Sequence, residues 1–321
     1  MANGHANIAS YFVLFAALAM SLQLSPRSVA GAGVNDSGAK QNTQNSNDLA
    51  IAADWVLIPG GKFVMGATAD QKADFYKFGG SPQWMSFAQP LVESSGPAHD
   101  VHLDSFYIFR HEVTNSQYQK FVSATGHRNS GRAFDPRFNG PNQPVVTVTW
   151  NDAQSFCVWI GARLPTEAEW EKAARGTAGL IYPWGNTWDA AKLRSMDGIA
   201  HQALPSIEEW ENWRKQNMRN APSEAQPADV GSYPDGASPY GVMDMAGNVW
   251  EWVADWFDPM YYANAPKHNP KGPESGDFRV LRGGAWDTPI PVNFTWLRQT
   301  FMPPSDARTV TGFRCAKDYT S

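Results

Sequence analysis

Two carboxylates with a glycine between them stand in segment 241–252, which reads Gly-Val-Met-Asp-Met-Ala-Gly-Asn-Val-Trp-Glu-Trp. Gly247, between Asp244 and Glu251, allows a tight turn that exposes carbonyl oxygens. A hard cation such as Ca²⁺ takes roughly six to eight oxygen ligands from carboxylates, carbonyls and water. The spacing allows a calcium site, and it equally allows an ordinary strand-turn-strand at a tryptophan-rich edge of the core.

The chain has two cysteines, Cys157 and Cys315. In an exported protein a pair of cysteines favours a disulfide. The alternative is a reactive thiol. The apolar face of the helix predicted around Cys157 disfavours that alternative, because structural buried thiols are inert.

The seven histidines are scattered along the chain and do not form a metal-binding motif. His99 and His102 are three residues apart in a predicted strand, which directs their side chains to opposite faces. We therefore interpret both as core or surface residues.

The composition indicates a folded protein with much loop and no basic surface. Of the 321 residues, 42 % are hydrophobic, and the chain has 14 Trp, 27 Gly and 23 Pro. Such a mixture is typical of a compact fold with few long helices. The net charge of −5 gives no basic field, so we expect no nucleic-acid partner.

The N-terminus has the features of an export signal. The apolar run 11–24 has 14 residues, short of the roughly 20 that a membrane span needs, and Ser28-Val29-Ala30 fits a cleavage site. We expect a signal peptide over 1–30, a flexible linker over 31–52, and a periplasmic or secreted protein without a stable membrane span. The alternative for the apolar run is a short buried helix.

One domain is predicted over 53–319, since no repeat or second linker interrupts it. Residues 55–58 and 63–66 read as strands that flank a Pro-Gly-Gly turn and predict a hairpin, and 101–108 reads as one further strand. Segment 199–228 contains a polar helix and reads as a surface insertion. This insertion is interpreted either as a lid or partner contact, or as a solvent-exposed excursion without a functional role.

Three short helices are predicted. The first begins at Thr114-Asn115 and ends at Gly126, and the second covers 151–160. The third begins with the capping box of Thr166 and Glu169, and Gly176 ends it.

Many ordered blocks of the chain resemble the formylglycine-generating enzyme family, also called the sulfatase-modifying factor family. The resemblance implies a single α+β domain with a formylglycine-generating-enzyme-like fold, C-type-lectin-like and low in regular secondary structure. The similar blocks are residues 56–66, 112–118, 144–153, 163–171, 182–185, 247–252, 282–284 and 312–315.

The resemblance also implies binding residues. Asp244 and Glu251 would bind a structural Ca²⁺ through their side chains, and Gly247 and Val249 through their carbonyls. The family usually has Asn where Asp244 stands. The resemblance further implies that Cys157 and Cys315 form a structural disulfide.

The chain departs from the family after Arg282-Gly283-Gly284. Formylglycine-generating enzymes have two catalytic cysteines there that bind copper, and alignment without gaps places Thr288 and Asn293 at their positions. A hydroxyl and an amide do not replace the thiolates that hold Cu(I). Formylglycine generation by the usual mechanism is therefore disfavoured.

A cleft retained from the family would be lined by the residues that follow the glycine pair. Tryptophan supplies apolar contact for a substrate, an arginine binds a carboxylate, and a buried aspartate can act as a base. The alternatives are core packing for the tryptophans and a structural ion pair for the charged residues. The candidates are Asp287, Thr288, Asn293 and Arg298 for catalysis, and Trp286 and Trp296 for substrate binding.

Three functions follow from the resemblance. The first is oxidative modification of a peptide or peptide-like metabolite without the copper-binding cysteine pair, as in the pyoverdine-maturation branch, with the redox metal unknown. The alternative is a non-catalytic, calcium-stabilised module that binds a peptide, a protein or a peptide-like metabolite. The least favoured is a formylglycine-generating oxidase acting on sulfatases.

Overall fold

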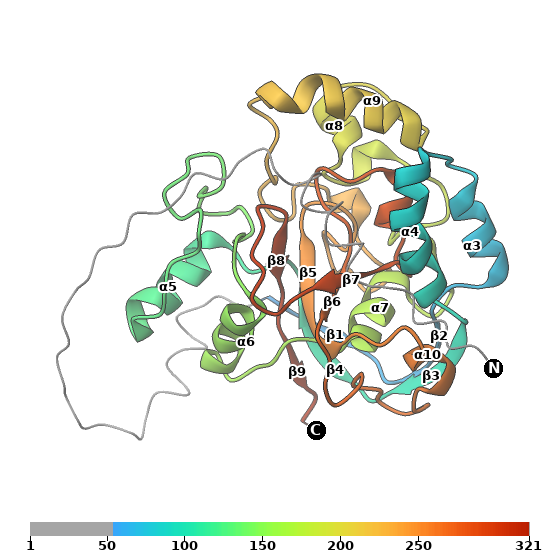
Figure 1. Cartoon of the computed structure of the whole chain (residues 1–321). Helices are drawn as coiled ribbons and strands as arrows, with labels where there is room; N and C mark the ends of the chain where they lie inside the picture. The colour runs from blue at the N-terminus through green and yellow to red at the C-terminus, as the bar shows by residue number, and fades with distance from the viewer. Residues whose placement is uncertain (1–53, 321) are drawn as a thin grey trace. The chain divides into compact units, whose positions relative to one another are not determined.

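The computed structural model describes residues 54–320, so the predicted signal peptide 1–30 and linker 31–52 lie outside the described part. Short helices and strands alternate with long loops (Figure 1), which confirms the predicted α+β class. No helix within residues 54–320 is long and apolar enough to cross a bilayer.

Nine short strands form three sheets in the described part, with strand orders β1-β4-β9, β2-β3 and β7-β6-β5-β8. All pairs are antiparallel except β5 with β8. The strands are β1 (Trp55–Ile58), β2 (Gly61–Met65), β3 (His99–Leu103), β4 (Phe106–Phe109), β5 (Trp250–Trp256), β6 (Arg279–Arg282), β7 (Arg298–Met302), β8 (Thr311–Phe313) and β9 (Ala316–Asp318).

The predicted hairpin between the first two strands is wrong. β1 pairs with β4, and β2 pairs with β3, so segment 55–65 runs antiparallel to segment 99–109 along its whole length. The alternating pattern identified both strands correctly. The partner of each strand is set by long-range packing, which the local turn does not reveal.

The single strand predicted over 101–108 is also wrong, because the chain breaks at Asp104-Ser105 into β3 and β4. Val101 and Leu103 are buried before the break, whereas Phe106 and Ile108 are buried after it. The buried positions thus change from odd to even numbers. Since strand side chains alternate between faces, this change of parity requires a break.

The predicted helices are present. α5 (Asn115–Thr125) has Thr114 as its N-cap, and Gly126 ends it with φ +73°. α6 (Trp150–Trp159) begins one residue earlier than predicted, and α7 (Glu167–Arg175) has the predicted capping box of Thr166 and Glu169. The remaining helices are α3 (Ala69–Tyr76), α4 (Pro82–Ser94), α8 (Met196–Ala200), α9 (Ile207–Asn217) and α10 (Tyr261–Asn264), with 3₁₀ turns at Ala190–Lys192, Met218–Asn220, Pro234–Gly236 and Ile290–Asn293.

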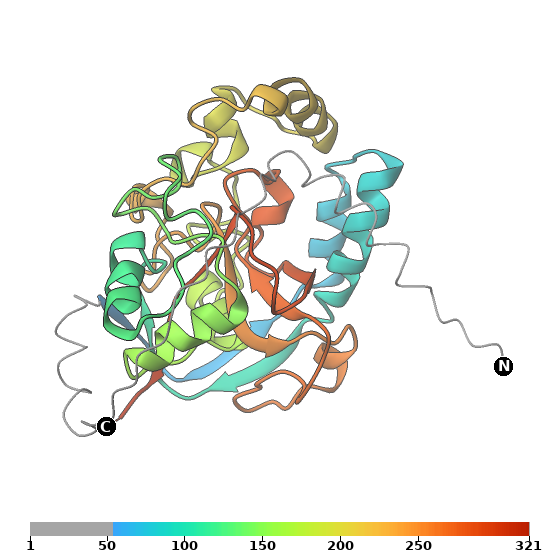
Figure 2. The same ribbon diagram turned by 60° about the vertical axis from the view of Figure 1, so that its left-hand side comes forward.

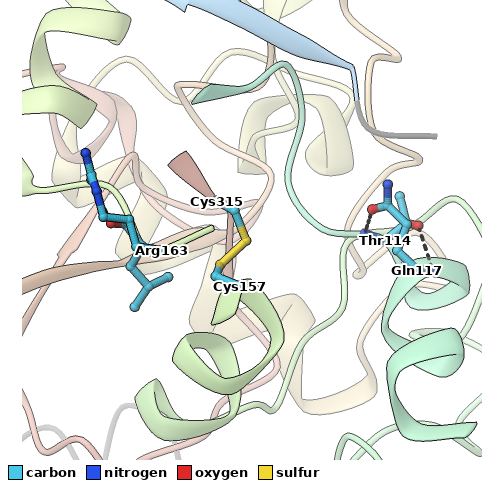
Figure 3. Close-up of a disulfide and its surroundings, with 6 residues drawn as sticks. Thr114, Gln117, Cys157, Arg163 and Cys315 are labelled. Atoms are coloured by element: carbon cyan, nitrogen blue, oxygen red, sulfur yellow. Dashed lines mark hydrogen bonds between the residues drawn. A yellow bond between two sulfur atoms is a disulfide. The ribbon is translucent and has the colours of Figure 1, made fainter. Parts of the chain in front are cut away.

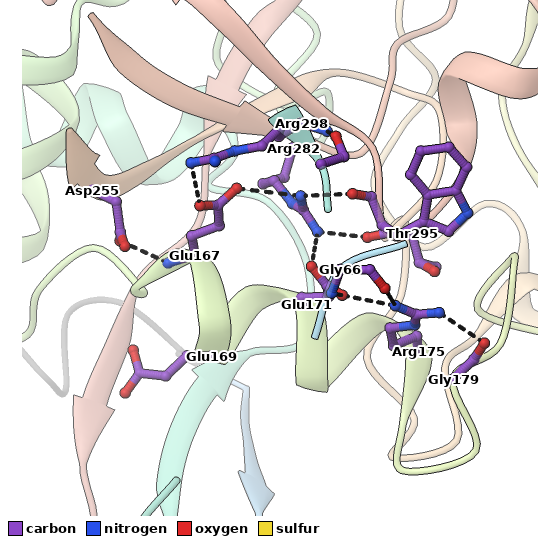
Figure 4. A network of polar contacts seen from close by, with 12 residues as sticks. Gly66, Glu167, Glu169, Glu171, Arg175, Gly179, Asp255, Arg282, Thr295 and Arg298 are labelled. Atoms are coloured by element: carbon purple, nitrogen blue, oxygen red, sulfur yellow. Dashed lines mark hydrogen bonds and ion pairs between the residues drawn. The ribbon is translucent and has the colours of Figure 1, made fainter. Parts of the chain in front are cut away.

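Helix α7 is buried along its length, and Figure 4 shows the partners of its Glu167, Glu171 and Arg175 side chains. Glu171 accepts hydrogen bonds from Arg175 Nη1 at 2.8 Å and from Arg282 Nη2 at 2.6 Å, and its Oε1 also accepts from the Gly66 N–H. Glu167 pairs with Arg298 at 2.7 Å. Buried charges require such partners. The network therefore fixes α7 against the ends of β6 and β7.

Candidate functional site

The turn that carries the predicted calcium ligands folds back through left-handed residues. Asp244, Gly247 and Asn248 have φ values of +58°, +75° and +55°. Asp and Asn are the non-glycine residues that best tolerate this region. A Cβ on Gly247 would lie 2.4 Å from the Arg194 carbonyl oxygen, so only glycine fits there.

The two predicted carboxylate ligands have different surroundings. Asp244 is 7 % exposed, and its Oδ2 accepts a hydrogen bond from the Gly231 N–H at 2.7 Å. Glu251 is fully buried and forms a bidentate ion pair with Arg314, with Nε–Oε2 at 2.6 Å and Nη2–Oε1 at 2.7 Å. Trp170 Nε1 also donates to Glu251 Oε2 at 2.9 Å. Both oxygens of Glu251 thus have donors within the protein.

A third carboxylate, Glu112, faces the same turn. Its Oε1 accepts from Asn248 Nδ2 at 3.1 Å, whereas its Oε2 is buried without a hydrogen-bond partner among residues 54–320. Burial, and then the charge of Asp244, raise the pKa of Glu112 well above its ordinary value. In the sequence, Glu112 is only the first residue of the family-like block 112–118, and no local signal places it in the site.

The implied calcium ligands therefore fit this structure in part. Asp244 offers a buried carboxylate. The charge of Glu251, however, is already neutralised by Arg314, and Trp170 Nε1 donates a hydrogen bond to it. Within the described residues, no group of three or more His, Cys, Asp and Glu side chains is arranged to hold a metal ion. The oxygen that lacks a donor lies on Glu112 instead.

The second predicted region begins at Arg282-Gly283-Gly284. Only glycine can occupy position 284. Gly284 has φ +79°, and a Cβ there would lie 2.3 Å from Asn293 Oδ1. Arg282 donates to the carbonyl oxygens of Thr295 and Trp296 at 2.6 Å and 3.2 Å, as well as to Glu171 (Figure 4). These bonds fold residues 285–297 into a compact loop against β6.

Thr288 and Asn293 come together within this loop. Thr288 Oγ1 lies 3.2 Å from Asn293 Oδ1 and 2.9 Å from the Ala285 carbonyl oxygen. Asn293 is fully buried, and its Nδ2 donates to the Pro289 carbonyl at 2.9 Å. The polar groups of both side chains are thus bonded within the loop.

The other candidates of this region are packed into the interior. Trp286 and Trp296 are 4 % and 0 % exposed, and Arg298 is 0 % exposed and paired with Glu167. Burial raises the pKa of Asp287, which is half-buried and whose carbonyl oxygen accepts from Trp210 Nε1 at 3.1 Å. These contacts match core packing for the tryptophans and a structural ion pair for Arg298. Roles in catalysis and substrate binding stay predictions.

Two segments cover the loop 285–297. Phe75 of α3 and Phe78 contact Phe294, with ring centroids 6.2 Å and 6.0 Å apart. Helix α9 crosses near the ends of α3 and α4 (Figures 1 and 2), where Trp84 and Trp210 lie with ring centroids 5.5 Å apart. The 199–228 segment therefore packs on α4 and on the loop through Trp210 of α9.

The predicted disulfide is confirmed. Cys157 of α6 and Cys315 before β9 are bonded, with 5.6 Å between their Cα atoms, and both are fully buried (Figure 3). The chain has no other cysteine. No thiol is therefore left to act as a nucleophile or a soft metal ligand while this bond is intact.

Comparison with known proteins agrees with this fold. The model of the sulfatase-modifying factor enzyme 1-like domain matches residues 40–319. The formylglycine-generating enzyme of Streptomyces coelicolor is 34 % identical over 310 residues, covering 82 % of this chain and 88 % of that enzyme. The hercynine oxygenase of Mycolicibacterium smegmatis is 32 % identical over 275 residues, covering 74 % of this chain and 55 % of that enzyme.

Among solved structures, PvdO from Pseudomonas aeruginosa superposes with a TM-score of 0.60 at 28 % identity. The superposition covers 83 % of this chain and 94 % of PvdO. The similar proteins thus include enzymes named for generating formylglycine and for oxygenating hercynine, so oxidative modification is an activity found among them.

Proposed function

Because this chain belongs to the sulfatase-modifying factor family, we propose that it is a non-catalytic, calcium-stabilised module that binds a peptide, a protein or a peptide-like metabolite. The observation that carries the proposal is the hydrogen bonding of Thr288 and Asn293 within loop 285–297. Thr288 and Asn293 stand where the resemblance places the copper-binding cysteines, and their polar groups bond to each other and to the loop. Nothing in that arrangement supplies a thiolate for Cu(I).

Calcium has a structural part in this proposal. A hard cation at the 241–249 turn would neutralise the buried carboxylate of Asp244 and hold the turn in its left-handed conformation. Asp244 supports this part, since it is buried and its Oδ2 has one backbone donor.

Export is proposed on two independent grounds. The apolar run and cleavage pattern of residues 1–30 are typical of a signal peptide. A buried disulfide also suits an oxidising compartment such as the periplasm or the cell exterior.

The second candidate function is oxidative modification of a peptide or peptide-like metabolite without the copper-binding cysteine pair. Identity of 34 % to a formylglycine-generating enzyme across 88 % of its length favours this candidate. It requires a redox centre of another kind, and the side chains after the glycine pair would then bind the substrate.

Peptide capture followed by mass spectrometry separates the two candidates. The purified chain is immobilised, exposed in air to a library that includes cysteine-containing peptides, and the retained peptides are eluted and weighed. We expect retained peptides of unchanged mass and no dioxygen uptake above a buffer control. Retained peptides with a changed mass, together with peptide-dependent dioxygen uptake, would instead support the oxidative candidate.

A further inference from the structure

A groove runs between helix α5 and the loop 129–141. Helix α5 lies on the side of the domain away from α3 and α4 (Figures 1 and 2). The groove has a volume of about 700 Å³, which falls within the roughly 300–1,000 Å³ of most ligand sites. All of its lining residues lie between positions 115 and 141, so it is distinct from loop 285–297.

The loop that forms the second wall is fixed by its own hydrogen bonds. Asn115 Nδ2 donates to the carbonyl oxygens of Phe138 and Gly140 at 2.9 Å and 3.0 Å. The Ser116 N–H donates to the Pro141 carbonyl at 3.0 Å. Phe138 is buried and anchors the loop in the core. A ligand therefore meets a wall that is already formed, so binding loses little free energy to ordering it.

The groove is lined mainly by hydroxyl and amide side chains. Ser116, Gln119, Ser123 and Asn129 are exposed among them, and the first three lie on one face of α5. Hydroxyl and amide groups donate and accept hydrogen bonds, as their counterparts in an extended peptide backbone require. No acidic side chain lines the groove among the residues that the structure describes, whereas Lys120 does.

The charge of this region is opposite to that of the whole chain. Segment 115–141 contains one Lys, three Arg and a single acid, Asp135, in a chain of net charge −5. Arg132 and Arg137 share Asp135, at 3.2 Å and 3.3 Å, and Arg128 pairs with Asp152 of α6. Positive charges thus exceed negative ones after these pairings, so the region attracts an anionic ligand.

An exposed aromatic ring stands next to the groove. Phe134 is 86 % exposed and directly follows Ala133, which lines the groove. Covering this ring would remove apolar surface from water. The ring therefore favours a ligand that combines its negative charge with an apolar side chain.

We propose that this groove binds an acidic segment of a peptide, with an apolar residue of that segment covering Phe134. The proposal rests on the proposed peptide-binding function and gives that function a location and a ligand class. Positions 116 to 123 span about 10 Å of helix, which equals about three residues of extended chain. The acids of the peptide lie against segment 115–141, and its backbone bonds to the hydroxyl and amide groups.

Fluorescence anisotropy on the purified chain tests the proposal with a labelled peptide in which Asp-Phe-Glu-Gly occurs twice. Two comparison peptides replace the acids by Asn and Gln, or by Lys. We expect the acidic peptide to bind about ten-fold or more tightly than either comparison peptide, because its charge complements the groove. The preference should shrink as salt is added, since these charges are partly exposed.

Three exposed positions locate the binding site. Ser123→Trp fills the groove, Lys120→Gln removes its charge, and Phe134→Ala removes the ring beside it. We expect the acidic peptide to bind about ten-fold or more weakly to Ser123→Trp and about three-fold or more weakly to each of the other two. Val158→Trp on α6 and Lys215→Gln on α9 are the matched controls, because both residues are exposed and lie outside the groove. Both should bind like the wild type, and Tm should be unchanged throughout.

Wild-type affinity in Ser123→Trp, or equal affinity for the acidic and neutral peptides, would overturn the proposal and leave peptide binding elsewhere on the chain in place. If Ser123→Trp fails to fold, Gln119→Trp on the same face replaces it, and wild-type affinity in that variant contradicts the proposal. Tighter binding of the acidic polysaccharide polygalacturonate than of the acidic peptide would also overturn it. A wild type that retains no peptide from the capture library would refute both the proposal and the peptide-binding function.

Discussion

The side chains of Thr288 and Asn293 meet inside the loop that follows Arg282-Gly283-Gly284, with Oγ1 3.2 Å from Oδ1. These are the positions at which the family resemblance places a pair of copper-binding cysteines. The backbone therefore brings the two positions together, although neither residue type here binds Cu(I). At these two positions, the side chains lack the sulfur ligands that the resemblance implies for a copper enzyme.

Restoring both sulfurs tests that relationship. In the reduced Thr288→Cys/Asn293→Cys variant the two thiolates should lie close enough to share Cu(I), so we expect about one copper ion per chain in a competition assay against a chromogenic chelator. The Thr288→Cys variant is the control and should bind far more weakly, as should the wild type. Equal Cu(I) binding by the wild type and the double variant would contradict the paired arrangement.

Helix α9 should control access to the same loop. Trp210 contacts Trp84 and donates to the Asp287 carbonyl, so Trp210→Ala removes both contacts. In an Asn293→Cys background, we expect the added thiol to react with a thiol reagent about ten-fold or more faster after Trp210→Ala, because the local opening of the cover becomes easier. Lys215→Ala, on the exposed face of α9, is the control and should leave the rate unchanged.

The buried disulfide should stabilise the domain substantially. Replacing Cys157 and Cys315 by alanine should lower the free energy of unfolding by about 2–5 kcal/mol, measured by urea titration at neutral pH. In reducing buffer, the disulfide of the native wild type should stay intact until the domain unfolds, because both sulfurs are fully buried. Rapid reduction of the native wild type would contradict this burial.

Asp255 gives the domain a specific pH dependence. Burial, and then the charge of Glu167, raise the pKa of Asp255 to about 8, whereas an aspartate in an unfolded chain ionises near pH 4. Between roughly pH 4 and pH 8 the native state thus holds a proton that the unfolded state has lost, so the contribution of Asp255 to stability falls as the pH rises.

The Asp255→Asn variant should remove this dependence. Its side-chain carbonyl can still accept the Glu167 N–H, which lies 2.7 Å from Asp255 Oδ2. We expect a flatter pH profile of the unfolding free energy between pH 5 and pH 8, measured by urea titration, and greater stability than the wild type at pH 8. The exposed Asp100→Asn variant is the control. Parallel profiles for wild type and Asp255→Asn would show that Asp255 ionises normally.

Local signals predicted the helix ends well. The Thr166 and Glu169 pair, and Gly126 after α5, act within one turn of the chain, so their effect can be read from adjacent residues. Strand partners could not be read in this way. β1 finds β4 across some fifty residues, a pairing that depends on which buried faces meet in the finished core.

The candidate site was predictable where the resemblance supplied a motif and not where packing defines the surroundings. The cysteine pairing followed from the resemblance. The cover formed by α3, α4 and α9 did not, because α3 is mostly polar with Phe75 as its one buried residue and α4 contains Pro90. Glu112 lies far from Asn248 in sequence, so its approach to the 241–249 turn is a result of the tertiary fold alone.

Elemental analysis of the mature protein, purified without chelators, tests the proposed function most directly. We predict calcium at about one ion per chain, because a hard cation would neutralise the buried Asp244 carboxylate of the 241–249 turn, and copper and iron only at trace level. Copper or iron bound in proportion to the protein, with dioxygen consumed when peptide is added, would contradict a non-catalytic module.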